Sequence, residues 1–132
     1  MNCLLDTHAF LWAVMDTKKL SATVRAALAD SANTVAVSAV SFWEIALKSA
    51  LGKLVLNGVT SAELPGFAVD MGLEVLPLKA DVAASFSRLP RLQHRDPFDR
   101  MLIWQAICEK HVLVSRDKDL SAYHNLGLKQ LW

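Results

Sequence analysis

The sequence predicts an α/β fold, in which a mostly parallel central sheet of four to five strands is flanked by helices. Two observations lead to this prediction. Short apolar runs of strand length alternate with segments of helical periodicity, and the turns between them are short. Such alternation implies right-handed crossovers, which place helices on both faces of a parallel sheet. Because the chain has 132 residues and no repeat or linker, we expect one domain over residues 1–132.

Five segments have the composition of buried strands. Each is short and mainly apolar, as expected for strands that are covered on both faces. The expected strands lie at residues 2–5, 34–38, 73–78, 112–114 and 129–132. The last is a short tail segment, and for this reason we expect four to five strands.

Helical patterns fill most of the chain between these runs. The expected helices lie at residues 8–15, 22–30, 38 or 41 to 51, 81–87 and 97–110. The third begins at Ser38 or Ser41 and stops at Gly52, a common C-terminal signal. Residues 57–72 have a weaker pattern, because Pro65 limits where a helix can begin there.

The helix expected at residues 97–110 opens with two acids, Asp96 and Asp99, on either side of Pro97-Phe98. Asp96 is a good N-cap, and Pro97 suits the first helical position. Asp99 falls in the first turn, where the helix dipole favours negative charge. These local preferences could explain both acids, so a further role depends on where the other acids lie.

Composition indicates a folded protein whose overall charge favours no particular partner. Hydrophobic residues make up 53% of the chain, charged residues 20%, and the net charge is +1. Cys3 and Cys108 lie in apolar surroundings without CxxC spacing, so we expect two reduced core cysteines and neither a disulfide nor a zinc site. Asp6 interrupts the first apolar stretch, which has no basic leader, and the longest charge-free run, residues 31–43, is shorter than the roughly 20 residues of a membrane span. We therefore expect a cytoplasmic protein that does not enter a membrane.

Four acids are expected at the carboxyl edge of the sheet, where ligands bind in folds of this class. Asp6 ends the first strand, and Asp117 follows the fourth. Asp99 begins a helix that a crossover connection brings back to the same edge. Glu44 lies in the helix after the second strand, beside an expected buried stripe. Each acid could also have an ordinary role, such as a turn, a helix start or, for Glu44, a surface ion pair with Lys48.

Carboxylates gathered at one place repel one another unless a cation or protons intervene. Mg²⁺ or Mn²⁺ would resolve this conflict, because hard divalent ions prefer oxygen ligands. Such ions promote hydrolysis of phosphodiesters. Four arginines near the opening of the helix at residues 97–110 could hold the phosphates of a nucleic acid. These arginines are Arg88, Arg91, Arg95 and Arg100.

Four segments that contain these acids resemble the motifs of a known family. The segments are DTHAFLW (6–12), VSAVSFWEIALK (37–48), RDPFDRMLIWQA (95–106) and VSRDKDL (114–120). Together they resemble the four acid-bearing motifs of PIN-domain ribonucleases, in particular VapC-type toxins of prokaryotic toxin-antitoxin pairs. The resemblance spans nearly the whole chain with the motifs in the right order, and it implies a PIN-like fold.

The resemblance also implies roles for individual residues. The implied metal-binding and catalytic residues are Asp6, Glu44, Asp99 and Asp117. Ser115 occupies the hydroxyl position that orients the last acid. We assign Asp96 and Thr7 supporting roles beside the metal ligands, since the N-cap argument already accounts for Asp96.

The implied activity is that of an endoribonuclease that depends on Mg²⁺ or Mn²⁺ and cleaves transfer or ribosomal RNA to inhibit translation and growth. The implied partners are the RNA substrate, a VapB-like antitoxin and a second copy of the chain in a homodimer. Two other functions stay open. One is a phospho-receiver-like signalling domain, for which residues 73–79 offer no acceptor aspartate. The other is a catalytically inactive PIN-like binding module.

Aromatic residues leave further questions open. Trp43 and Trp104 lie on helical apolar stripes, so we expect them in the core or in a dimer contact. The stripe of Trp43 is expected to bury Val40, Trp43, Leu47 and Ala50. His8 and Trp12 lie close to Asp6 in the sequence, and either one could contact substrate or pack locally.

Overall fold

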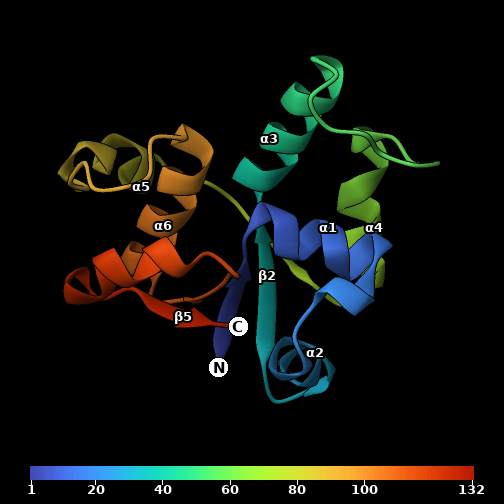
Figure 1. Ribbon diagram of the computed structural model, residues 1–132, viewed down its shortest axis with the longest axis horizontal. Coiled ribbons are helices and arrows are strands. Elements are labelled where there is room, and N and C mark those ends of the chain that lie inside the picture. The colour runs from blue at the N-terminus through green and yellow to red at the C-terminus, as the bar shows by residue number, and fades with distance from the viewer.

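A computed structural model describes all 132 residues and contains one parallel sheet with helices on both faces (Figure 1). The strands are β1 (Asn2–Leu5), β2 (Thr34–Ser38), β3 (Glu74–Leu76), β4 (Val112–Val114) and β5 (Lys129–Leu131). All four neighbouring pairs are parallel. The predicted α/β class is therefore confirmed, and the short tail segment forms the fifth strand.

The strand order, β3-β2-β1-β4-β5, places β1 at the centre of the sheet. The chain first builds outward through β2 to β3, and then continues on the other side of β1 with β4 and β5. Leu5 at the end of β1 lies opposite Val37 of β2 and Val114 of β4. The strand order thus reverses between β1 and β4, and in parallel sheets such a switch point opens a crevice for ligands.

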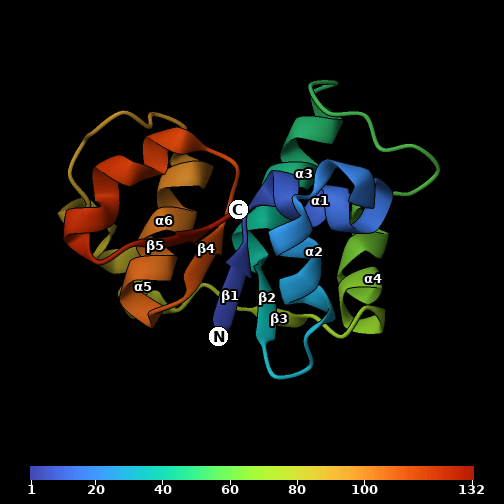
Figure 2. The same ribbon diagram turned by 60° about the horizontal axis from the view of Figure 1, so that its bottom comes forward.

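Helices divide between the two faces of the sheet, as Figure 2 shows. One face is covered by α1 (Thr7–Met15), α2 (Ala22–Ala29), α3 (Ala39–Ala50) and α4 (Leu64–Asp70). The other face is covered by α5 (Ala80–Ala84), α6 (Pro97–Glu109) and the 3₁₀ helix Lys118–Leu126. None of these helices is both long and apolar enough to cross a membrane.

Two apolar clusters lie on opposite faces of the sheet because side chains alternate along each strand. In β1, Cys3 and Leu5 pack into the cluster beneath α1, α3 and α4. Leu4, between them, packs into the cluster with Ile103 and Ala106 of α6. This alternation fixes the register of the central strand, and with it the position of the residue that follows Leu5.

Several predicted element boundaries were wrong. α1 begins at Thr7, one residue before the predicted start, because the Asp6 side chain caps it. The helix predicted at residues 81–87 divides into α5 and the 3₁₀ turn Phe86–Arg88. The 3₁₀ helix after β4 was not predicted. Cys3 is buried as expected, but Cys108 on α6 is exposed, so its assignment to the core was wrong.

The buried face of α3 also differs from the prediction. Trp43 is 63% exposed and Leu47 is exposed as well. The residues of α3 that are buried are Val40, Ser41, Glu44 and Ile45. The face toward the sheet is therefore partly polar, which the apolar periodicity alone could not indicate. Trp104, in contrast, is partly buried against the second cluster, and its Nε1 donates to the Val82 carbonyl.

Candidate metal centre

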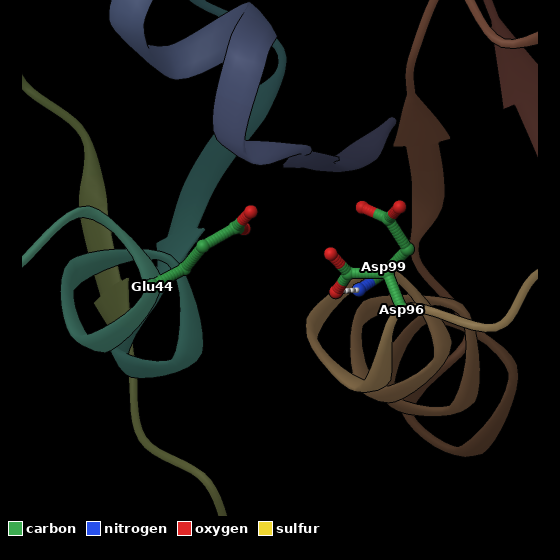
Figure 3. A group of neighbouring side chains, drawn as sticks. All are labelled: Glu44, Asp96 and Asp99. Atoms are coloured by element: carbon green, nitrogen blue, oxygen red, sulfur yellow. Dashed lines mark hydrogen bonds between the residues drawn. The ribbon is translucent and has the colours of Figure 1, made fainter. Parts of the chain in front are cut away.

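The four predicted acids converge at the carboxyl edge of the sheet, and Asp96 joins them. Asp6, Asp99 and Asp117 line a cavity of about 290 Å³. One oxygen from each of Glu44, Asp96 and Asp99 lies within 4.8 Å of the others, and Figure 3 shows Glu44 reaching from α3 toward the first turn of α6. Asp99 belongs to both groups. The cavity and the close group of oxygens therefore share the Asp99 carboxylate.

Three of these acids are held in place because they also cap helices. The Asp6 carboxylate accepts a hydrogen bond from the Ala9 amide at 2.8 Å, at the start of α1. Asp96 accepts from the Phe98 amide at 2.8 Å at the start of α6. Asp117 accepts from the amide of Asp119 at 2.9 Å. Each of these helices has its N-terminus near the carboxyl edge of the sheet. The caps therefore hold the three carboxylates at that edge.

Glu44 is 2% exposed, so it is not an ordinary surface residue. The Thr7 hydroxyl donates to Glu44 Oε1 at 2.5 Å and lies 3.0 Å from the Ser41 hydroxyl. A buried carboxylate needs such donors, because burial without hydrogen bonds is costly. The supporting role expected for Thr7 is thus consistent with its position: it orients Glu44 from the first residue of α1.

Lys48 binds both Glu44 and Asp96. It forms the expected ion pair with Glu44 one turn earlier on α3, and its Nζ also lies 3.3 Å from Asp96 Oδ2 on α6. Burial acts to lower the pKa of Lys48, but the two carboxylates outweigh it and raise the pKa. Burial acts to raise the pKa of Asp96, but the amides of Phe98 and Asp99 together with Lys48 outweigh it and lower that pKa. Asp96 is therefore more than a helix cap, because its second oxygen faces the acid group.

Asp117 is oriented from two sides. Its backbone amide donates to Ser115 Oγ at 3.1 Å, so Ser115 holds the backbone from which the carboxylate extends. Its Oδ2 lies 2.5 Å from Nε2 of His94, and Nδ1 of His94 lies 3.1 Å from the Tyr123 hydroxyl. Burial acts to raise the pKa of Asp117, but the bonds from His94 and from the Asp119 amide lower it. Asp117 thus stays an anion with a fixed orientation.

Asp6 and Asp99 are the acids of the group whose pKa values are raised. Burial raises the pKa of Asp6, and the nearby Glu44 adds to this effect. Burial together with the Asp96, Glu44 and Asp6 carboxylates raises the pKa of Asp99 to about 6. Carboxylates with raised pKa values gain from a bound cation, because it favours their charged form. A donor set made of carboxylate oxygens fits a hard divalent ion such as Mg²⁺ or Mn²⁺, and both the cavity and the close group contribute such oxygens.

The four predicted arginines do not form one patch. Arg100 is 9% exposed and donates to the Leu89 and Pro90 carbonyls at 3.2 and 3.1 Å, so it anchors the preceding loop and does not reach solvent. Its prediction as an RNA contact is therefore contradicted by its burial. The charge of Arg88 acts on Cys108, which lies near the far end of α6 from Asp99. Arg91 and Arg95 are exposed on the loop that leads to Asp96.

Sequence reasoning missed Arg116, although it stands between Ser115 and Asp117 in the fourth motif. Arg116 lines the acid cavity, and its guanidinium carbon lies 4.9 Å from the centre of the Trp12 ring. His8 and Trp12 line the same cavity. Both therefore lie where a bound molecule could touch them. The signal available for Arg116 was its position in the sequence, two residues after the end of β4 and next to Asp117.

Comparison with known proteins gives both a family match and similar folds. Residues 3–126 match the sequence model of the PIN domain family. The chain is similar to VapBC2 from Rickettsia felis, solved bound to a DNA fragment from their promoter, with a TM-score of 0.68 at 14% identity over 100% of this chain and 99% of that chain. It is also similar to VapBC-1 from nontypeable Haemophilus influenzae, with a TM-score of 0.67 at 15% identity over 99% and 97%.

A third similar structure is VapBC-5 from Mycobacterium tuberculosis, described as a member of the VapBC family of toxin-antitoxin systems. Its TM-score is 0.59 at 17% identity, over 98% of this chain and 97% of that chain. No curated protein sequence gives a significant match. At identities this low, the TM-scores show a shared fold and nothing more.

Proposed function

Because the chain belongs to the PIN domain family, we propose that it is a divalent-metal-dependent endoribonuclease of the VapC type. The single observation that supports this most is the convergence of Asp6, Glu44, Asp99 and Asp117 at the switch point of the sheet. These acids come from four segments that are distant in the sequence. We also propose that residues 1–132 act as one PIN domain.

The proposed ion is Mg²⁺ or Mn²⁺. Asp6, Asp99 and Asp117 would hold it in the cavity that they line, with Glu44 beside them. When bound, such an ion activates water for attack on phosphorus and offsets the negative charge that develops on the phosphate.

Neighbouring residues of the chain would keep these ligands in position. Thr7 fixes Glu44, whereas Ser115 and His94 fix Asp117. Partners of this kind set the orientation of metal ligands and therefore the affinity for the ion. The charge of Arg116 at the rim of the cavity would draw an RNA phosphate toward the acids.

RNA is the proposed substrate, and transfer or ribosomal RNA the proposed target class, whose cleavage would inhibit translation and growth. Exposed Arg91 and Arg95 on the loop before α6 support binding of the RNA backbone. Arg88, farther along the second face, would contact only a longer RNA. The cytoplasm of a prokaryotic cell is the proposed location.

Protein partners are also proposed, namely a VapB-like antitoxin and a second copy of the chain. Exposed large apolar side chains support protein contacts, because they are costly to leave in water. Trp43, Leu47 and Leu51 follow one another at intervals of four residues along α3 and its end. The Trp43 ring packs against Phe98, the residue before Asp99, so a protein that covered this stripe would lie beside the acid cluster.

RNA cleavage by the purified chain tests the nuclease proposal. Cleavage should require Mn²⁺ or Mg²⁺, stop with a chelator, and be lost in Asp6→Asn, Asp99→Asn and Asp117→Asn variants that keep the melting behaviour of a folded protein. Asp70→Asn is a suitable control, since Asp70 is exposed on α4. Sequencing the RNA ends after brief expression in cells would identify the target.

The second candidate function is a PIN-like module that binds RNA or protein without cleaving it. The pairing of Lys48 with Glu44 and Asp96 is the observation that favours it, because a lysine inside the acid group already neutralises part of its charge. Binding of RNA without metal-dependent cleavage would support this alternative. The phospho-receiver alternative is set aside, because the chain is a PIN domain.

A further inference from the structure

The acid group contains two adjacent cation positions, and a lysine of the chain already reaches one of them. The first position is the cavity among Asp6, Asp99 and Asp117. The second lies among Glu44, Asp96 and Asp99, whose oxygens come within 4.8 Å of one another. The ammonium group of Lys48 contacts two of the three acids at the second position.

From this arrangement we propose that Lys48 takes the place of a second metal ion. On this proposal, which rests on the proposed nuclease function, the protein binds one divalent ion among Asp6, Asp99 and Asp117. The ammonium group of Lys48 offsets one of the two negative charges of Glu44 and Asp96 and excludes a second divalent ion from that side of Asp99.

The contacts of Lys48 support a fixed position for its charge. Its ion pairs join α3 to the first turn of α6, and the ammonium group also lies 5.6 Å from the centre of the Phe98 ring. The side chain is only 31% exposed, so its bonds are less screened than those of a surface pair. Glu44 is held from the other side by Thr7, which keeps its carboxylate directed at the lysine.

Charge balance supports the same assignment. Five carboxylates with one divalent ion would leave a large uncompensated negative charge, and two divalent ions are one way to reduce it. Lys48 supplies one positive charge on the side of Glu44 and Asp96. No lysine lines the cavity formed by Asp6, Asp99 and Asp117, where Arg116 and His8 bring basic groups to the rim and His94 contacts Asp117. The cavity is therefore the position left for the ion.

Counting bound Mn²⁺ in the full chain tests this proposal. Calorimetric titration of the wild type should give one ion per chain. In the Lys48→Met variant, which keeps the apolar stem and removes the charge, Glu44, Asp96 and Asp99 become available together, and two ions should bind. Lys48→Arg should keep one. Lys79→Met is the matched control, because Lys79 forms an ion pair with Glu109 away from the acid group, and it should also keep one.

A second measurement needs no substitution and therefore covers the case in which Lys48→Met fails to fold. The rate at which an amine-acylating reagent modifies Lys48, followed by mass spectrometry, should be the same with and without saturating Mn²⁺. A rate that rises with Mn²⁺, while that of exposed Lys53 does not, would mean that the ion displaces the lysine and would overturn the proposal.

Two ions on the wild type, or one ion on the Lys48→Met variant, would also overturn it. These failures are distinguishable from failure of the nuclease function. A wild type that binds two ions and cleaves RNA would refute only the role of Lys48, whereas one that binds no ion and cleaves no RNA would refute both.

Discussion

Nε2 of His94 lies 2.5 Å from Oδ2 of Asp117, and the other ring nitrogen of His94 faces the Tyr123 hydroxyl. The side chain of His94 is 7% exposed, whereas that of Asp117 is 41% exposed. A buried ring therefore fixes a carboxylate that opens into the cavity. Because both nitrogens of His94 are engaged, we expect it to orient Asp117, which is a proposed metal ligand.

Replacing His94 by alanine should weaken Mn²⁺ binding by about 10- to 100-fold, the usual effect of losing a partner that orients a metal ligand. The pKa of Asp117 should rise toward its ordinary value, but the carboxylate stays ionised at neutral pH, so loss of orientation causes the effect. Calorimetric titration measures it. His94→Gln should recover part of the affinity, because its amide can donate the same bond.

His124→Ala is the control, since His124 is exposed on the 3₁₀ helix after Asp117. If His94→Ala binds Mn²⁺ as tightly as the control, the bond between His94 and Asp117 has no part in holding the ion.

The acids at the strand ends could be predicted from the sequence because their positions follow from topology. Asp6 comes directly after an apolar run and Asp117 three residues after another, and parallel strands end at one edge of the sheet. Asp99 followed from the crossover rule in the same way. A local pattern also indicated one of the acid caps, since Asp96 caps α6 as predicted.

Contacts between elements could not be predicted in this way. The approach of Lys48 to Asp96 depends on how closely α3 and α6 pack at their ends, and no local pattern encodes that distance. The buried position of Glu44 was missed for a related reason: apolar periodicity favoured the face with Trp43, but the polar group made by Thr7 and Ser41 accommodates Glu44 instead. The sequence likewise shows that Arg100 is a basic residue in a loop-to-helix segment. It does not show that the guanidinium donates hydrogen bonds to two backbone carbonyls and is therefore buried.

Asp99→Asn should stabilise the metal-free protein at neutral pH. Burial and the neighbouring carboxylates raise the pKa of Asp99 from 3.8 to about 6. The folded chain therefore holds this proton more tightly than the unfolded chain does, so folding stability falls as the pH rises from about 4 to 6. The full shift corresponds to about 3 kcal/mol, which solvent screening of this partly exposed group reduces to about 1 to 2 kcal/mol.

Thermal unfolding in the presence of a chelator measures this effect. The variant should gain little over wild type at pH 4.5 and clearly more at pH 7.5. Saturating Mn²⁺ should reverse the order at pH 7.5, because the wild type binds the ion and is stabilised by it. If the gain in stability of the variant over wild type did not change with pH, the asparagine would act in another way than by removing the negative charge of Asp99.

Arg100→Ala should destabilise the fold by about 2 to 3 kcal/mol, since it leaves the Leu89 and Pro90 carbonyls without their charged donor. The guanidinium also lies 5.2 Å from the centre of the Phe86 ring, and the alanine cannot replace this cation–π interaction. Urea unfolding measures the change. Stability equal to that of wild type, combined with weaker RNA binding, would return Arg100 to the RNA-binding residues from which its burial excludes it.

Arg91→Ala with Arg95→Ala should reduce the salt dependence of RNA binding. Each arginine that binds a phosphate releases counterions, so the slope of log affinity against log salt should become less steep by about 0.7 for each arginine removed from a single-stranded RNA. Both arginines are exposed on the loop before Asp96. Measuring the variants in the Asp99→Asn background prevents cleavage of the RNA during titration.

Arg88→Ala in the same background is the comparison, because Arg88 lies near Cys108 and should leave the slope for a short RNA unchanged. If the double variant keeps the wild-type slope, or if Arg88→Ala alone lowers it, the RNA follows the second face of the sheet and does not cross the loop before α6.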